Sequence, residues 1–523
     1  MIHLSIPDIA IILGFFGLVL YVGFRSSRKT HKTEEDFLLA GRSLTLPIFV
    51  MTLVSTWYGG ILGVGEFSYR YGISNWVTQG VPYYIFAAIF ALVLAKKIRE
   101  TNLYSIPDKL ELSYDKKTAL LGSVLTFILM LPAPYILMLS VFLQLLFGWS
   151  LPLSLGVTAL VALSYLYVGG FHSDIDTDVV EFVFMFLGFA IILPFCIDHF
   201  GGWRFLKANL PPLHLTWHGG NSAQYILVWF FIALWTLVDP AFHQRCYAAK
   251  DGATAQKGIF VSILFWLVFD FMTATAGLYA RATLPNLTDP MMAYPMLAES
   301  VLPSVAKGFF YVGMLATIMS TLNTLGFVSA QTLGRDLLQR YAMWDMNKKY
   351  KTPAMDEARF QRQIPNSRSV AYEVQTTLLD ETRRDMPITP TLKPADVVEP
   401  RLCRETLNLK LSSVQLTRIG LIVSFVVSVI FGLLVPSVIK IWYTIGTIVI
   451  PGLLVPLIAS YFERLKIPAK YAFLSMLLGW LTSLSWLIAG GGGEYPLGIE
   501  PMYPGLVIAV VMWVMGRTVE RRG

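Results

Sequence analysis

Apolar segments long enough to cross a lipid bilayer follow one another along almost the whole chain. A transmembrane helix needs about 20 mostly apolar residues. The sequence offers thirteen such segments, at residues 5–25, 45–70, 74–95, 118–148, 151–170, 177–197, 223–242, 257–280, 304–334, 416–436, 438–462, 467–490 and 501–518. Charged residues make up 14% of the chain, against about 25% in soluble proteins. The sequence therefore predicts an all-α, polytopic membrane protein with about thirteen transmembrane helices.

Basic residues gather in alternate loops, which predicts how the helices are oriented. The first apolar segment has basic residues after it and no lysine or arginine before it, the reverse of a signal peptide, so we expect a retained span. The loops after segments one, three, seven and eleven hold Arg25, Arg28, Lys29, Lys32, Arg42; Lys96, Lys97, Arg99, Lys109, Lys116, Lys117; His243, Arg245, Lys250, Lys257; and Arg464, Lys466, Lys470. Because basic loops face the cytoplasm, we expect a multi-pass protein of the plasma (inner) membrane. Its N-terminus would lie outside and its C-terminus in the cytoplasm.

A polar insert at residues 335–415 interrupts the apolar pattern on the predicted cytoplasmic side. Its first part, RDLLQRYAMW, favours a helix that continues out of the membrane. The remainder is rich in proline, mixed in charge and without the apolar periodicity of a folded core. It is typical of a flexible loop with one or two surface helices, and the alternative is a regulatory segment that docks a partner protein.

Two apolar segments carry residues that interrupt a helix. The second segment has adjacent Gly59 and Gly60, and the seventh has Asp239-Pro240 at a corresponding position. Glycine in a membrane helix also serves close helix packing. Helices that break at mid-membrane lead the two halves of inverted-repeat transporters. We therefore expect an extra N-terminal helix (1–30), a first repeat (45–197), a second repeat (223–462) interrupted by the 335–415 insert, and two C-terminal helices (467–518).

The ninth segment concentrates polar side chains within about one helical turn. Ser320, Thr321, Asn323 and Thr324 lie in an otherwise apolar stretch. Each hydroxyl can bond back to a carbonyl one turn earlier. Taken together, neutral oxygens at membrane depth are what a small, hard cation such as sodium needs in place of water.

Motifs of other protein classes are missing from the sequence. Cys196, Cys246 and Cys403 are dispersed, with no CxxC pair and no histidine at ligand spacing, which argues against structural zinc or an iron–sulfur cluster. Phosphate-binding, dinucleotide-binding and hydrolase motifs do not occur. We expect neither an enzyme nor a nucleic-acid-binding protein, and no cofactor.

Five local patterns, in order along the chain, resemble the sodium:solute symporter family. They are EDFLLAGRSL (35–44), GGFHSDIDTDVVEFVFMFLG (169–188), DPAFHQRCYAAKDGATAQKG (239–258), IMSTLNT (318–324) and IWYTIGTIVIPGLLVPL (441–457). The resemblance implies a LeuT-like five-plus-five inverted repeat with discontinuous lead helices. It also implies import of a small organic solute by alternating access, with Na⁺ as the coupling ion.

The resemblance also implies where sodium binds. Its main site would take the hydroxyls of Ser320 and Thr321 and the backbone carbonyls of Ser55, Tyr58 and Thr317. Some members bind a second sodium, for which the corresponding residues here are Asp178, Asn323 and Thr324. Asp178 could instead assist sodium release to the cytoplasm, or cap a helix that begins near Val179.

For the solute, the resemblance implies a cavity near the bilayer midplane. Trp235, Trp266 and Tyr443 fall at cavity positions of relatives, and Trp57 and Gln79 are further candidates. Asp270 lies in the middle of the eighth segment, one turn after Trp266. A carboxylate at this depth must face a cavity or a partner. Asp270 could bind a cationic or hydroxyl-rich solute, carry a coupling proton, or act as a structural hydrogen-bonding group.

Other functions fit the same sequence features. The chain could be a proton-coupled or uncoupled transporter of the same fold. It could also be a transporter-derived sensor that signals through the 335–415 insert.

Overall fold

The computed structural model describes residues 2–29, 33–342, 412–435, 438–491 and 495–520, and within these ranges the chain is helical without a β-strand. Met1–Gln339 and Ser413–Gly523 form one compact unit, and Arg340–Ser412 is assigned to a second one. Most of the 335–415 insert, for which we expect a flexible loop or alternatively a docking segment, lies outside the described residues at 343–411, together with Cys403. The predicted helical continuation at the start of the insert is confirmed as far as a π-helix at Thr332–Gln339.

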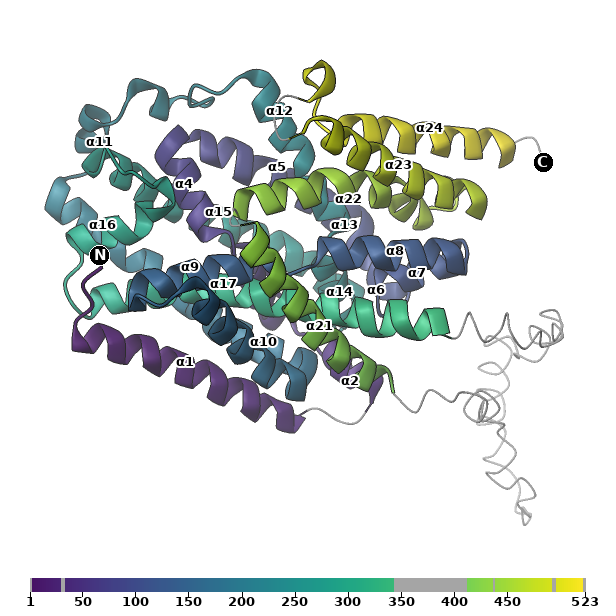
Figure 1. Ribbon diagram of the computed structural model, residues 1–523, viewed down its shortest axis with the longest axis horizontal. Coiled ribbons are helices and arrows are strands. Elements are labelled where there is room, and N and C mark those ends of the chain that lie inside the picture. Colours follow the sequence, from purple (N-terminus) through teal and green to yellow (C-terminus); the bar gives the residue numbers. More distant parts are fainter. Residues whose placement is uncertain (1, 30–32, 343–411, 436–437, 492–494, 521–523) are drawn as a thin grey trace, which may run out of the picture. The chain divides into compact units, whose positions relative to one another are not determined.

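Most of the principal helices run along the long axis of the view in Figure 1, and others cross them obliquely. The principal helices are α1 (Ile6–Ser26), α3 (Leu46–Trp57), α4 (Ile61–Tyr71), α5 (Val81–Phe90), α8 (Lys116–Leu129), α9 (Ala133–Phe147), α10 (Leu151–Phe200), α12 (Ala223–Ile232), α13 (Trp235–Val238), α14 (Pro240–Ala248), α15 (Gly252–Thr283), α17 (Ala306–Gln331), α21 (Ser413–Leu434), α22 (Val438–Ser460), α23 (Ala469–Ala489) and α24 (Met502–Glu520). Shorter helices are α2 (Glu34–Leu39), α6 (Lys96–Glu100), α7 (Ile106–Ser113), α11 (Trp203–Asn209) and α16 (Ala293–Val301).

Eleven of the described helices are long and apolar enough to cross a bilayer, or twelve with the bent pair α3–α4. Helix α10 alone is 50 residues long, about 75 Å at 1.5 Å per residue, which exceeds one bilayer crossing. It covers the predicted segments 151–170 and 177–197, and Gly170 inside it has non-helical backbone angles (φ 57°, ψ −140°). The all-helical membrane architecture is confirmed, and the number of thirteen stays a prediction.

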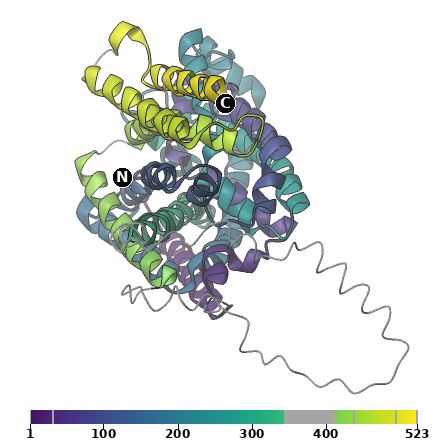
Figure 2. The same ribbon diagram turned by 90° about the vertical axis from the view of Figure 1, so that its right-hand side faces the viewer.

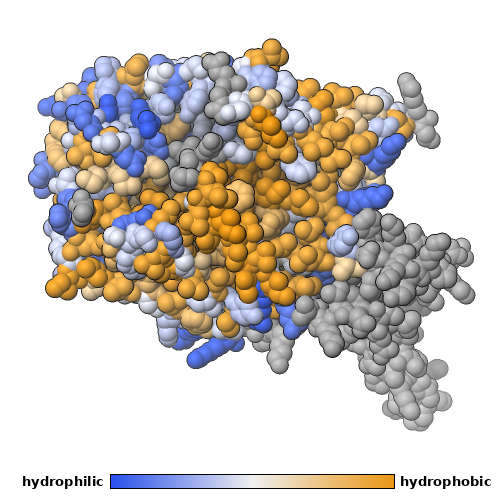
Figure 3. Space-filling model, viewed as in Figure 1, coloured by the Kyte–Doolittle hydropathy of each residue, from blue (hydrophilic) through white to orange (hydrophobic). Residues whose placement is uncertain are grey.

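Apolar side chains cover much of the middle of the face shown in Figure 3, and hydrophilic ones gather toward its left and right ends. Leu92, Leu160 and Leu264 are each more than 60% exposed. Exposed leucines are unfavourable in water but suit contact with lipid chains. The apolar middle of this face is what the long apolar segments of the sequence predict.

Helix α17 occupies the centre of the described bundle. Every residue from Phe310 to Gln331 is buried, and α10, α9, α3, α1 and α21 pack around it. Gly188 of α10 faces Gly313 of α17 so closely that a Cβ on either would collide with the other's backbone. Small residues allow this approach between membrane helices. Viewed along the helices, segments far apart in sequence lie beside one another (Figure 2).

Both predicted helix breaks are present. Helices α3 and α4 meet at an angle of 60° across Tyr58, Gly59 and Gly60. A Cβ on Gly59 would overlap Thr321, and one on Gly60 would overlap the Trp442 ring. The second break separates α13 from α14, where Asp239 accepts hydrogen bonds from the backbone N–H groups of Ala241 and Phe242 and so caps α14. The discontinuous lead helices are confirmed, whereas the repeat boundaries stay a prediction.

We expect Gly170→Ala to destabilise the protein by about 1–3 kcal/mol, because the backbone angles at this position exclude residues with a Cβ. The added Cβ would also lie 2.7 Å from the carbonyl oxygen of Phe37. Gly156→Ala is the matched control on the same helix, since nothing lies within 4 Å of its added Cβ. It should be neutral or stabilising by up to about 1 kcal/mol. Thermal unfolding of both variants in detergent tests this, and equal effects would contradict the account of the kink.

Candidate ion and solute site

The last turn of α3 meets the middle of α17 at the helix break. Thr321 Oγ1 donates a hydrogen bond to the carbonyl oxygen of Thr56 at 2.5 Å. Thr317 Oγ1 bonds back to Gly313 O at 2.6 Å, and Ser55 Oγ bonds back to Met51 O at 2.9 Å. The back-bonding alternative therefore holds for Thr317 and Ser55, while Thr321 bonds across the helix pair.

Ser320 and Asp178 join α17 to α10. Ser320 Oγ donates a hydrogen bond to Asp178 Oδ1 at 2.5 Å, and both side chains are buried. The structure corrects one alternative reading of Asp178, which was that it caps a helix starting near Val179. Helix α10 is helical on both sides of Asp178 and has its break at Gly170 instead. Asp178 is therefore an inward-facing side chain of a continuous helical stretch.

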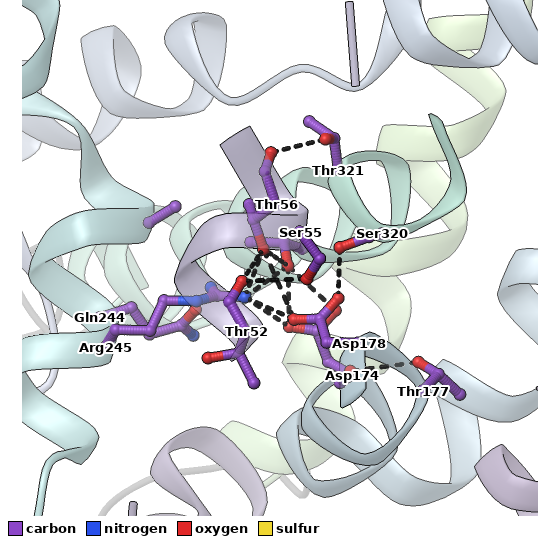
Figure 4. Close-up of polar contacts among 12 residues, drawn as sticks. Thr52, Ser55, Thr56, Asp174, Thr177, Asp178, Gln244, Arg245, Ser320 and Thr321 are labelled. Carbon is purple, nitrogen blue, oxygen red and sulfur yellow. Dashed lines mark hydrogen bonds and ion pairs between the residues drawn. The ribbon is translucent and has the colours of Figure 1, made fainter. Parts of the chain in front are cut away.

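Arg245 lies in the middle of this polar cluster (Figure 4). Its Nη2 donates to Asp178 Oδ2 at 3.0 Å, to Thr56 Oγ1 at 2.9 Å and to Thr324 Oγ1 at 2.7 Å. Asp174 Oδ2 lies 3.4 Å from the same nitrogen. The arginine side chain is 0% exposed. Assigning His243 and Arg245 to a basic loop was wrong, because α14 carries both into the protein and both are buried.

The formal charges in this region are not balanced by protein groups alone. Asp174 and Asp178 together outnumber Arg245 by one negative charge. Glu181, one helical turn after Asp178, is also fully buried, and its two oxygens have no hydrogen-bond partner among the described residues. Buried carboxyl groups are stable when they are protonated or when a positive charge lies beside them.

The three residues considered for a second sodium do not converge on one point. Thr324 Oγ1 donates to Asp174 and accepts from Arg245, so it belongs to the charged cluster with Asp178. Asn323 lines a separate cavity of about 190 Å³ with apolar neighbours such as Leu143. A site that used all three would need a rearrangement of Asn323.

A cavity of about 160 Å³ adjoins the helix break. Of the predicted solute residues, five line it: Trp57, Gln79, Trp235, Asp270 and Tyr443. Trp266, which we also expected in the cavity wall, does not line the cavity. The residue is 1% exposed and packs behind Trp57, with ring centroids 5.6 Å apart. Thr56 and Thr321 also line this cavity. The solute cavity and the contact between α3 and α17 therefore share a wall.

Further aromatic side chains complete the cavity and were not anticipated from the sequence. They are Tyr83, Tyr135, Trp229, Phe242 and Trp442. They come from helices distant in sequence, and none stands in a pattern that distinguishes it from ordinary core aromatics. Gly60 leaves space for the Trp442 ring, but nothing in the sequence pairs these two residues.

The two carboxylates of the cavity wall differ in their surroundings. Asp239 caps α14 and also accepts a hydrogen bond from Trp235 Nε1 at 3.0 Å. Asp270, on α15, is 6% exposed and accepts a hydrogen bond from the Tyr84 hydroxyl. No group of three or more His, Cys, Asp or Glu side chains with metal-binding geometry occurs among the described residues.

The sequence profile of the sodium:solute symporter family matches residues 37–353, well over half of the chain. The chain belongs to this family. Sodium-coupled symport of a small solute is the activity of such a symporter. The match includes the helix break, Arg245, Asp178 and the polar turn of α17.

Named relatives of this symporter include the sodium/pantothenate symporter of Haemophilus influenzae, 26% identical over 348 residues, which cover 64% of this chain and 71% of that protein. High-affinity choline transporter 1 of Drosophila melanogaster is 24% identical over 363 residues, which cover 64% of this chain and 57% of that protein. The substrates in these names differ, so the relatives do not agree on one solute.

Two solved structures share the fold of this symporter. The substrate-bound, outward-open state of a Na⁺-coupled sialic acid symporter superposes with a TM-score of 0.70 at 14% identity, over 98% of this chain and 97% of that one. Mhp1, a nucleobase-cation-symport-1 family transporter, gives a TM-score of 0.57 at 10% identity, over 92% and 93%. The fold inferred from the sequence is thereby confirmed.

We expect Arg245→Met to destabilise the symporter by about 3–5 kcal/mol, because it leaves the buried carboxylates uncompensated. The double variant Arg245→Met/Asp178→Asn should recover part of this loss, since it removes one of those charges and keeps an acceptor for Ser320. Chemical unfolding of the single and double variants in detergent measures the coupling. Strictly additive losses would show that the guanidinium and the Asp178 carboxylate do not interact.

Proposed function

We propose that one sodium ion binds between the last turn of α3 and the middle of α17. Its ligands would be the carbonyl oxygens of Ser55, Tyr58 and Thr317 and the hydroxyl oxygens of Ser320 and Thr321. Because α3 ends at Trp57, carbonyl groups of its last turn lack the amides of a following turn. The Thr321 hydroxyl already bonds to this turn through Thr56 O; it can rotate, keep its proton and offer its oxygen to a cation.

The observation that carries this proposal is the shared wall of the ion site and the solute cavity. Tyr58 and Thr321 belong to the proposed ion site and also line the cavity. An ion that fixes the helix break against α17 therefore shapes the cavity beside it. Coupling of this kind is reciprocal, so bound solute must raise sodium affinity by the same factor.

Transport would follow by alternating access. Sodium favours the conformation in which the cavity takes up solute from outside, and the two halves of the bundle then reorient. Inward movement of one positive charge through 100 mV releases about 2.3 kcal/mol. Asp178 bonds to Ser320, and we propose that it draws sodium away from the site on the release path, with Thr324 beside it. Asn323 would join a second ion only after turning from its apolar cavity.

We further propose that the chain lies in the plasma (inner) membrane with its N-terminus outside and its C-terminus in the cytoplasm, and that it performs transport rather than an enzymatic reaction. The solute is a small organic molecule that fits the cavity. Proton-coupled or uncoupled transport is the alternative, since Asp178 and Asp270 could each carry a proton.

The experiment is a thermal-stability titration of the purified symporter with sodium, at constant ionic strength against potassium and without added solute. Sodium at about 100 times its dissociation constant should stabilise the folded protein by about 2.7 kcal/mol. Thr321→Ala should abolish the sodium-specific part. Ser329→Ala is the matched control, because Ser329 is a buried hydroxyl of the same helix that bonds to Ser424 instead.

Equal stabilisation by sodium and potassium in the wild type would contradict the proposed site. So would a sodium effect that survives in Thr321→Ala. If Thr321→Ala and Ser329→Ala both lost the sodium effect, the loss would come from disturbed packing of α17, and Thr321 would not be supported as a sodium ligand.

A further inference from the structure

We propose that the transported solute is a small organic cation, held in the cavity by Asp270 and by aromatic side chains. This inference rests on the proposed function, because it concerns the solute of the same symporter. The charged residues that line the cavity are Asp239 and Asp270, and no lysine, arginine or histidine of the described residues lines it. The wall therefore offers negative charge and no positive partner for a carboxylate or phosphate.

Arg245 does not alter this charge balance at the cavity surface. It lies behind Thr56, is 0% exposed, and directs its Nη2 toward Asp178, Asp174 and Thr324. Figure 4 shows the guanidinium directed at these carboxylates on α10. Its positive charge is held by two acidic residues outside the cavity lining, so an anionic solute could not recruit it without breaking that cluster.

Of the two cavity carboxylates, Asp270 is the one suited to bind a ligand. Asp239 already accepts hydrogen bonds from two backbone amides of α14 and from Trp235 Nε1. Asp270 lines the cavity, has no backbone amide of the described residues as a donor to its side chain, and is contacted by the hydroxyl groups of Tyr84 and Tyr58. A carboxylate in a membrane helix is favourable when it meets a positive charge, and a cationic solute supplies one.

Aromatic side chains line the same cavity as Asp270 and are suited to bind a positively charged group. The Trp57 ring contacts the rings of Tyr83 and Phe242 at centroid distances of 5.0 and 5.3 Å, both edge-on. Tyr135 and Trp442 form a second pair at 5.6 Å. The faces of such rings carry negative potential, and cages of them recognise alkylammonium groups such as choline. A neutral apolar solute would fill the same walls but would leave Asp270 without a counter-charge.

The cavity also limits the solute's size. Its volume is about 160 Å³, and an apolar cavity of about 150 Å³ holds a benzene molecule. A compact ammonium compound of comparable size fits this volume.

The test uses a pair of probes that differ in charge and not in shape. Choline and 3,3-dimethylbutan-1-ol have the same skeleton, with a quaternary nitrogen in the first and a carbon in the second. Binding to the full-length wild type is measured by isothermal titration calorimetry in sodium, with glucose as a neutral comparison and pantothenate as an anionic one. We expect choline to bind about tenfold or more tightly than its neutral isostere.

Asp270→Asn removes the charge while keeping an acceptor for Tyr84, and it should weaken choline binding about tenfold or more. Glu66→Gln is the matched control, because Glu66 forms an ion pair with Arg70 at 2.9 Å and does not line the cavity. It should leave choline affinity unchanged.

Equal binding of choline and its isostere overturns the proposal, and this comparison needs no variant. Failure of choline to bind, binding of glucose or pantothenate instead, or full choline affinity in Asp270→Asn also overturns it. The sodium titration without solute reports on the proposed ion site separately. A sodium effect with no cation binding would therefore refute the solute class and leave sodium coupling intact.

Discussion

The structure depends on the contact between a helix that stops inside the membrane and the polar turn of a central helix. Unsatisfied backbone groups are unfavourable in hydrocarbon, so a helix that ends at Trp57 needs partners for its last carbonyl groups. Helix α17 supplies them through Thr321, which donates to Thr56 O. Gly59, which has no side chain, leaves room for the Thr321 side chain beside this turn. If the remaining carbonyl groups at the end of α3 take a sodium ion as their partner, the stability of this contact depends on sodium.

The buried charges behind this contact make the same region responsive to cations. Arg245 links Thr56 of α3, Thr324 of α17 and the carboxylates of α10 through one nitrogen. Three helices are therefore joined by charge-assisted hydrogen bonds in a medium of low dielectric, where such bonds are strong and unpaired charges are costly. The arginine, which lies on α14, is thus a shared contact of α3, α10 and α17.

Local patterns in the sequence predicted the parts of the structure that are set locally. Adjacent Gly59 and Gly60 and the Asp239-Pro240 pair indicated the two helix breaks. The hydroxyls of Ser320 and Thr321 indicated a sodium site, which stays a prediction. Contacts between side chains that lie far apart in the sequence could not be predicted from such local patterns. In the sequence Arg245 looks like a basic loop residue, but in the structure it lies on α14 and is buried. Trp266 shares a helix face with Asp270 but lies behind Trp57. The sequence ended one apolar segment at residue 170, where the backbone does bend, but it began the next segment only at residue 177, whereas α10 resumes directly after Gly170.

The central claim is that sodium fixes the break between α3 and α4 against α17. Hydrogen–deuterium exchange of the purified symporter, in sodium and in potassium at equal ionic strength, tests it most directly. Exchange reports local opening of backbone hydrogen bonds. Sodium should slow exchange in peptides that cover residues 55–62 and 317–324, and leave peptides of α23 and α24 unchanged. Identical exchange of residues 55–62 in the two salts would contradict the account.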